Sequence, residues 1–262
     1  MNEFLGSLLP VRVEVALLVL TRVLALLSTA PPFSNATSWS SFRLPLGATI
    51  TWLLLFAIGE PGWTGPQFGL ALIPLVAMEF LLGALLGWIV ASAFAAVRGA
   101  GDLITGEVGL NLASLLDPVT GTTTPVMSTL YQTMAGLVFL AMGAHRWVIA
   151  GLAHSFDRIP IGTFAIGADP VDGLLLLTSR LLEAGIVLAA PVMAAMFLVT
   201  LLLGLSSRAV PQLNLMDVGY AIRIAAAFGA IAVLLPTFRI GLESLFLTMR
   251  DALGNALPST VK

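Results

Sequence analysis

The sequence predicts an all-α integral membrane protein, and three observations lead to that class. Hydrophobic residues make up 58% of the 262 residues and charged residues only 10%, whereas a soluble domain has about 25% charged residues. The mean hydropathy of the chain is +1.00. Long apolar segments, several of them long enough to reach across a bilayer as helices, fill most of the sequence. The length suits about six membrane-embedded helices in one domain that spans residues 1–262.

The composition also excludes several classes of function. The net charge of −2 gives no basic surface for nucleic acid, and the single lysine, Lys262, argues against a polybasic lipid-binding segment. The chain has no cysteine, which excludes disulfides and thiolate metal sites. No HExxH, GxSxG or GxxxxGK motif occurs, and His145 and His154 have no evident metal-ligand partners. We therefore predict no catalytic residues, no metal and no cofactor.

The first apolar segment, Val11–Ala30, is expected to be a helix that ends at Pro31–Pro32, because proline cannot continue a helix interior. Glu14 and Arg22 interrupt this segment. A charge at the bilayer centre costs roughly 2.5–3.5 kcal/mol, so each of the two side chains should face protein, water or a headgroup. The polar residues of Phe33–Phe42 are typical of an interfacial connection.

The next two apolar segments have lengths that do not match one flat layer of lipid. Leu44–Gly59 would be about 24 Å long as a helix, which is shorter than the hydrocarbon core of roughly 30 Å. Phe68–Val97 would be about 45 Å long as one helix. Pro74 should start or kink this longer segment.

Small residues recur at every fourth position along the longer segment and continue back to a carboxylate. Such a row lets another helix backbone approach closely. Two interpretations stay open, which are packing against a helix of the same chain and a seam for a partner subunit. The candidate helix-packing seam consists of Glu79, Gly83, Gly87, Ala91, Ala95 and Gly99.

The stretch Gly99–Pro125 is the longest departure from hydrophobicity in the first half of the chain. Its glycines, its threonine run and the pair Asp117–Pro118 predict an irregular backbone. Its leucines make it too apolar for a solvated linker, and irregular backbone at membrane depth survives only inside protein or along a wet cavity. We expect a loop packed inside the membrane-level body, with an ordinary interhelical loop as the alternative.

Helices should fill most of the second half of the chain. Thr124–Pro125 predicts the start of a helix that runs to about Ala144. After a turn-rich connection over Phe156–Ala168, a helix should begin at Asp169–Pro170 and run to about Leu205.

A kink is expected at Pro191 within that long helix. The residues Pro211-Gln212-Leu213-Asn214 form a compact polar turn, and a final helix should follow from Val218 to about Met249.

Two groups of residues resemble the FliR family of flagellar biosynthetic proteins over nearly the whole chain. The first group contains Gly101-Asp102, Gly106 to Leu110, Ala113, Asp117-Pro118, Pro125-Val126, Phe139-Leu140 and His145. The second contains Pro191-Val192, Gly204-Leu205, Arg208 to Asn214 and Val218-Gly219-Tyr220. The related injectisome proteins, termed SctT-like, share the Pro-Gln-x-Asn core, but Val218-Gly219-Tyr220 looks more flagellar. Asp217 stands where the family usually has aliphatic or aromatic residues.

The resemblance implies a non-enzymatic structural subunit of the flagellar type III protein export gate, in the flagellar basal body and the bacterial inner membrane. That gate is a helical assembly of kinked helical hairpins with FliP-like and FliQ-like subunits and an FlhB-like subunit, surrounded by membrane lipid. It conducts unfolded flagellar export substrates. About residues 1–168 would form a FliP-like part and about residues 169–262 a FliQ-like part. The alternatives are the equivalent subunit of a virulence-type injectisome and a small-solute transporter. Many transporters are built from two repeated halves, and we find no internal repeat in this sequence.

The resemblance also implies two functional segments. In the family, the loop that matches residues 107–124 plugs the closed channel. The candidate plug residues are Gly106, Glu107, Gly109, Leu110, Asn111, Leu112, Leu115, Leu116, Asp117, Pro118 and Gly121. The candidate residues of the polar turn are Arg208, Pro211, Gln212 and Asn214.

Overall fold

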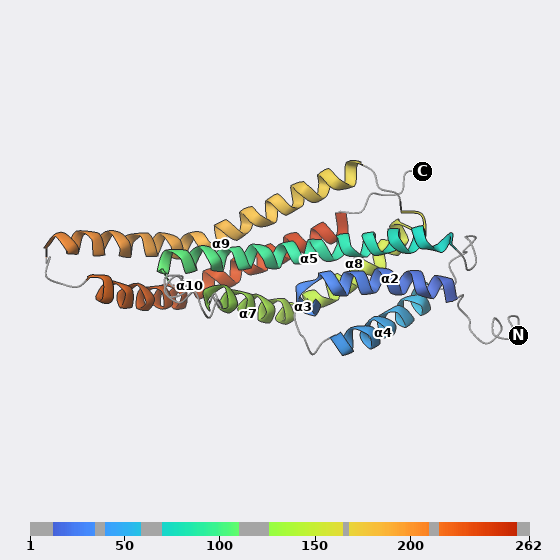
Figure 1. Cartoon of the computed structure of the whole chain (residues 1–262), viewed down its shortest axis with the longest axis horizontal. Helices are drawn as coiled ribbons and strands as arrows, with labels where there is room; N and C mark the ends of the chain where they lie inside the picture. Colours follow the sequence, from blue (N-terminus) through green and yellow to red (C-terminus); the bar gives the residue numbers. More distant parts are fainter. Residues whose placement is uncertain are drawn as a thin grey trace, which may run out of the picture. The chain divides into compact units, whose positions relative to one another are not determined.

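The computed structural model describes residues 13–34, 40–58, 70–109, 126–164, 168–209 and 215–255. All regular elements in these ranges are α-helices, and the ranges contain no strand, so the predicted all-α class is confirmed (Figure 1). In chain order the helices are α2 (Val13–Thr29), α3 (Pro31–Ser34), α4 (Ser40–Ile58), α5 (Leu72–Val108), α7 (Val126–Ala141), α8 (Ala144–Arg158), α9 (Ala168–Ala209) and α10 (Leu215–Asn255).

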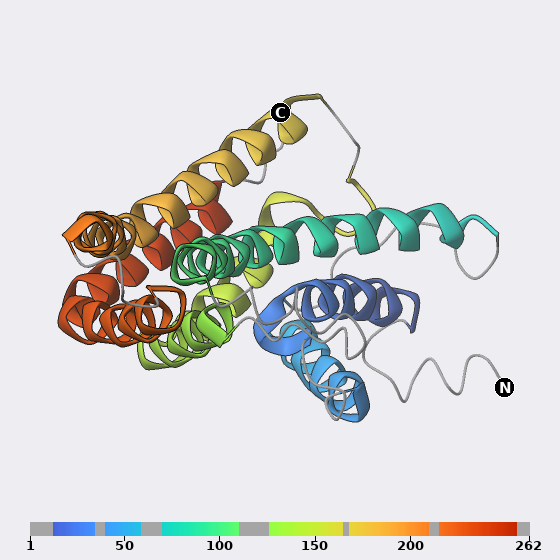
Figure 2. The ribbon, with the colours of Figure 1, turned by 60° about the vertical axis from the view of Figure 1, so that its left-hand side comes forward.

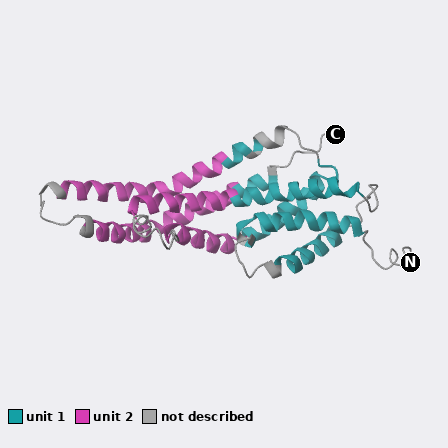
Figure 3. Ribbon diagram, in the orientation of Figure 1, with its two compact units in different colours: residues 1–91, 144–178, 249–262 teal, residues 92–143, 179–248 magenta. Residues whose placement is uncertain are grey.

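The chain divides into two compact units, and each takes segments from distant parts of the sequence (Figure 3). Unit 1 comprises residues 1–91, 144–178 and 249–262, and unit 2 comprises residues 92–143 and 179–248. The long helices α5, α9 and α10 therefore each contribute to both units. The expected FliP-like and FliQ-like parts rest on the resemblance and stay a prediction.

Unit 1 is built around α2, which lies beside α4 (Figures 1 and 2). Leu18 and Val23 of α2 and Leu82 of α5 have no exposed surface and form the centre of its core. Helix α8 packs on the last turns of α10, where a Cβ atom added to Gly151 would lie 3.2 Å from Cβ of Leu253. This contact joins α8 to the last turns of α10 within unit 1.

Unit 2 has an aromatic core. The rings of Phe94 in α5, Phe139 in α7 and Phe246 in α10 lie pairwise 5.5 to 5.6 Å apart. Tyr131 of α7 meets Phe238 of α10 edge to face at 4.5 Å. Tilted and edge-to-face pairs at these distances stabilise the core beyond their buried area. The aromatic side chains therefore fix α5, α7 and α10 against one another.

The described residues contain three helices that are long and apolar enough to cross a membrane, or four if α7 and α8 form one bent span. The three spans are Leu72–Val108, Leu175–Ser206 and Gly219–Gly254. The most apolar part of the first is 61% buried inside the chain, but the corresponding parts of the other two are only 22% and 17% buried. Lipid or other subunits must therefore cover most of the apolar surface of α9 and α10.

Helix α5 extends well beyond its expected end at Val97. Residues 99–108, which we expected to belong to the irregular loop, continue the helix. The reason is a buried stripe at helical spacing: Ala100, Ile104 and Val108 are at most 1% exposed. This burial outweighs the roughly 1 kcal/mol by which each glycine disfavours a helix interior.

One other element differs from the expected ones. Helix α8 begins where the preceding helix was expected to end, at Ala144, and occupies residues for which we predicted no helix. Gly143, between α7 and α8, has a positive φ of 67°. Helix α9 runs through Pro191, as expected for a proline inside the long helix, and the kink predicted there stays a prediction. Helix α10 likewise contains Pro236.

Candidate functional site

The structure describes the two helices that flank the candidate plug. Gly106 and Glu107 lie near the end of α5, so these two candidates are helical and not part of an irregular loop. Gly109 follows the helix with a φ of 83°, and its N–H donates to the carbonyl oxygens of Thr105 and Gly106. A glycine in this left-handed conformation is a common helix C-cap. Outside the described residues lie Leu110, Asn111, Leu112, Leu115, Leu116, Asp117, Pro118 and Gly121.

The flanking helices α5 and α7 meet close to where the candidate plug leaves them. A Cβ atom added to Gly101 would lie 2.5 Å from Cα of Ser128, so only glycine permits this approach. The buried Ser128 hydroxyl donates a hydrogen bond to the Asp102 carboxylate. Asp102 also lies 3.9 Å from Arg98, one turn earlier on α5. The connection over residues 110–125 therefore starts and ends at helices that are fixed to each other.

The candidate polar turn falls between the two longest helices. Arg208 lies in the last turn of α9, and α10 begins at Leu215. Pro211, Gln212 and Asn214 lie outside the described residues. The helix boundaries on either side agree with a short connection at this position, and the roles of its side chains stay a prediction.

The candidate seam along α5 has two different halves. A Cβ atom on Gly83 would collide with the carbonyl oxygen of Arg22 and lie 2.8 Å from Cβ of Ala25. A Cβ atom on Gly87 would collide with the hydroxyl of Thr29 and lie 3.0 Å from the carbonyl oxygen of Leu26. The first half of the row therefore packs against α2 of the same chain, which was one of the two open interpretations.

The second half of the seam is more open. Ala91 and Gly99 are half-buried and Ala95 is exposed. A Cβ atom added to Gly99 would meet no other atom within 4 Å. Only this half of the row leaves room for another subunit.

Glu79, at the start of the seam, forms an ion pair that the sequence did not reveal. Its Oε2 atom lies 2.6 Å from Nε of Arg22, and neither side chain has any exposed surface. The two residues are 57 positions apart in the sequence. The sequence indicated only that each residue needs a polar partner, because each is a charged residue in an otherwise apolar segment.

Further hydrogen bonds and a ring contact satisfy the remaining donors and acceptors of the two charged side chains. The Arg22 guanidinium donates to the Ser155 hydroxyl at 3.1 Å and to the Ile159 carbonyl oxygen at 3.3 Å, and it stacks 4.0 Å from the centre of the Phe156 ring. Glu79 Oε1 accepts the Gly162 N–H at 2.9 Å. Buried charges are tolerated when their remaining donors and acceptors are satisfied in this way. The network joins α2 and α5 to α8 and the turn that follows it.

Comparison with known proteins places the chain in a family. The model of the family described as bacterial export proteins, family 1, matches residues 13–249. The chain belongs to this family. It is 34% identical to the flagellar biosynthetic protein FliR of Pectobacterium carotovorum over 90% of each chain, and 29% identical to FliR of Bacillus subtilis over 92% of this chain and 93% of the other. It is also 34% identical to the Yop proteins translocation protein T of Yersinia pestis, over 60% of each chain.

The match to the bacterial export proteins confirms the resemblance to FliR and SctT-like proteins. It includes both halves of the seam, the buried ion pair and both flanks of the candidate plug. The described part of this family member contains no group of three or more His, Cys, Asp or Glu side chains that could hold a metal ion. Of the two histidines, His154 pairs with Asp157 at 3.5 Å on the exposed surface of α8.

Proposed function

We propose that the chain is a structural subunit of the type III protein export gate in the bacterial inner membrane, and specifically of the flagellar gate. The single observation that carries this proposal is the family match over residues 13–249. The flagellar assignment is supported by coverage, because the Pectobacterium FliR matches 90% of this chain and the Yersinia translocation protein 60%. The Yersinia relative keeps a virulence-type secretion system as the second candidate.

The exposed apolar helices are consistent with a subunit that works inside a larger assembly. The most apolar parts of α9 and α10 are mostly uncovered in the isolated chain. Other export-gate components can cover such surface, since the apolar faces of neighbouring membrane helices pack on one another. We infer that the partners are FliP-like and FliQ-like subunits and an FlhB-like subunit. The inferred cargo is unfolded flagellar protein.

The plug is assigned to the connection over residues 110–125. The contact between Gly101 and Ser128 supports this assignment, because it holds together the two helices that this connection joins. A seal must be stable at rest and still open on demand, so we expect a free-energy difference of a few kcal/mol between the closed and open states. In this role the chain seals the channel and lets protein pass through it, and neither task requires a chemical reaction.

A tagged chain expressed from its own chromosomal locus tests the proposed function. We expect it to co-purify from membranes with at least two other small membrane proteins. Deleting its gene should stop the appearance of flagellar proteins in the culture medium, and a plasmid copy should restore them. Loss of virulence proteins from the medium, with flagellar proteins unchanged, would favour the second candidate. A chain that purifies alone and transports a small solute in proteoliposomes would contradict both.

A further inference from the structure

An apolar groove of about 500 Å³ lies between α9 and α10 within unit 2. Binding sites for small molecules usually have volumes of roughly 300–1,000 Å³, so this groove is large enough for part of a lipid. The register of α9 against α10 is set by a close approach, in which a Cβ atom added to Gly241 would lie 2.6 Å from Cδ1 of Leu188. The residues that line it lie on one face of each helix.

The groove has a polar end and an apolar end. Leu188 lies opposite Gly241, and the two helices run in opposite directions (Figure 1). Arg180 and Glu183 of α9 therefore lie at one end of the groove. Leu234, Thr237 and Phe238 of α10 lie at the other end, opposite the later lining residues of α9, and the threonine hydroxyl is the one polar group among these three side chains. This distribution fits a molecule with a charged head and an apolar tail.

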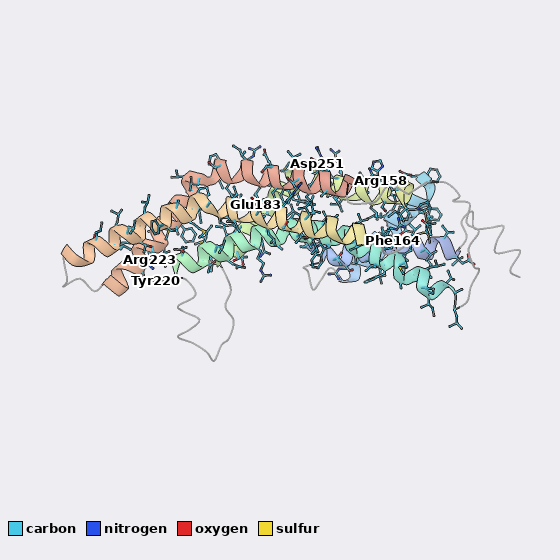
Figure 4. The ribbon with its side chains drawn as sticks, turned by 90° about the horizontal axis from the view of Figure 1, so that it is seen from above. Arg158, Phe164, Glu183, Tyr220, Arg223 and Asp251 are labelled. Carbon is cyan, nitrogen blue, oxygen red and sulfur yellow. The ribbon has the colours of Figure 1, made fainter. Side chains whose placement is uncertain are left out.

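The polar end carries one positive and one negative charge. Arg180 and Glu183 lie three residues apart and so share one helix face; Glu183 is labelled in Figure 4. Both side chains are exposed, and the described residues supply neither with an ion-pair partner. They fall near the start of the apolar span Leu175–Ser206. Charges at such a position extend toward the headgroup layer, where a lipid headgroup can neutralise them.

The length of the groove matches one leaflet of a bilayer. Val192 lies twelve positions after Arg180, which corresponds to a rise of about 18 Å along a helix. Half of the hydrocarbon core is roughly 15 Å thick. A lipid with its headgroup at Arg180 could therefore extend an acyl chain to the apolar end near the bilayer midplane.

We propose that this groove binds one phosphatidylethanolamine molecule. Arg180 donates to the phosphate and Glu183 accepts a hydrogen bond from the ammonium group, while one acyl chain lies against Val187, Leu188 and Phe238. Both headgroup contacts are charge-assisted hydrogen bonds, which are the strong ones. Phosphatidylglycerol has the phosphate but no ammonium for Glu183, and the quaternary ammonium of phosphatidylcholine has no hydrogen to donate. This inference requires a membrane location and does not depend on the proposed function.

Native mass spectrometry of the full chain, purified with the subunits that accompany it and then stripped of lipid, tests the proposal. The three phospholipids are added with identical acyl chains. We expect phosphatidylethanolamine to bind about tenfold more tightly than either of the others, the effect of one charge-assisted hydrogen bond. Glu183→Gln should abolish the preference over phosphatidylglycerol, and Arg180→Gln should weaken the binding of all three lipids.

Two further variants separate lipid binding from general damage. Arg239→Gln removes an exposed arginine of α10 that pairs with Glu243 and does not line the groove, so it should retain the lipid preference. Ala184→Phe places a ring inside the groove and should reduce the bound phosphatidylethanolamine at an unchanged melting temperature. Equal affinities of the original chain for phosphatidylethanolamine and phosphatidylglycerol would overturn the proposal.

A crosslinking experiment identifies the occupant in native membranes. The chain contains no cysteine, so Val187→Cys provides one unique attachment point for a photoreactive label. We expect the label to crosslink to phosphatidylethanolamine. Crosslinks only to another protein subunit would show that the groove is a subunit interface, and would overturn the proposal.

Discussion

Arg22 and Glu79 form an ion pair with an Nε–Oε2 distance of 2.6 Å, and neither side chain is exposed. One turn after Glu79 on α5, Gly83 has no side chain, and any Cβ atom there would collide with the carbonyl oxygen of Arg22. The two features depend on each other. The glycine sets the distance between α2 and α5, and the paired charges set which residues of the two helices face each other.

Breaking the ion pair from one side should destabilise the chain strongly. We expect Arg22→Met to lower the free energy of unfolding by roughly 3–5 kcal/mol, because it leaves a buried carboxylate without its cation. The measurements are the melting temperature of the purified chain and its steady-state level in membranes. The double variant Arg22→Met/Glu79→Met should recover most of the loss, since no buried charge remains. A single variant with the original melting temperature would show that the pair has no structural role.

The two halves of the seam should respond differently to the same substitution. Gly87→Leu should lower the amount of folded chain, because its side chain would collide with Thr29 of α2. At Gly99 a Cβ atom would meet no other atom within 4 Å, so Gly99→Leu should leave the folded monomer intact. If a partner packs on the second half of the seam, Gly99→Leu should also abolish the complex on a native gel. An intact complex with normal chain levels would exclude Gly99 from any subunit interface.

The contact between α5 and α7 gives a second matched pair of glycines on one helix. Gly101→Val should reduce folded protein, because even its Cβ atom would lie 2.5 Å from the Ser128 backbone. Gly106→Ala meets no other atom and should raise stability by about 0.5–1 kcal/mol through its better helix propensity. Thermal unfolding of both variants in the same detergent is the measurement. A Gly101→Val chain that unfolds at the original temperature would mean that α5 and α7 are not held together at this point.

Shortening the candidate plug should open the channel without preventing assembly. We expect deletion of residues 119–123 to remove contacts that exist only in the closed state, while α5 and α7 stay joined at Gly101 and Ser128. The measurement is the entry of ions or small dyes into cells that carry the deletion, compared with cells that carry the full chain. A fully assembled complex with an unchanged leak would place the seal on a partner subunit.

The polar turn before α10 should act on stability more than on conduction. Gln212 and Asn214 are expected to satisfy backbone groups where two helices end, and an unpaired buried group costs about 1–3 kcal/mol. Asn214→Leu should therefore lower the steady-state level of the chain, with little change in the export activity of the gates that remain. Asn214→Ser, which retains a hydrogen-bonding group, serves as the control. Normal levels together with altered export would assign Asn214 to the channel.

Much of the helical architecture could be predicted, because the length of an apolar segment and the positions of its prolines can be read directly from the local sequence. Helices α2 and α9 begin and end within about four residues of the predicted limits, and α10 within about six. The end of α5 could not be predicted in the same way. Gly99, Gly101 and Gly106 suggest a loop when they are considered alone. The helix continues through them because the stripe Ala100, Ile104 and Val108 is buried and Gly101 packs against α7.

The candidate sites show the same difference between local features, which the sequence reveals, and contacts between distant residues, which it does not. The seam was visible as a four-residue repeat, but its partner helix was not, since Gly83 and Arg22 are distant in the sequence. The sequence indicated that Arg22 needs a polar environment and could not identify Glu79 as the partner, because nothing local relates residues 57 positions apart. The groove between α9 and α10 depends on the register of two helices, which side-chain spacing within either helix does not determine.

The buried network also constrains the order of events while the chain is being made. Arg22 is synthesised 57 residues before Glu79 and 137 residues before Ile159. At a synthesis rate of about 5–20 residues per second, Glu79 is added roughly 3–11 seconds after Arg22, and Ile159 is added roughly 7–27 seconds after it. During this time α2 cannot occupy its final buried place in unit 1 with its charge neutralised. The nascent first helix must therefore be sheltered, by the insertion machinery or by lipid headgroups, until more than half of the chain has emerged.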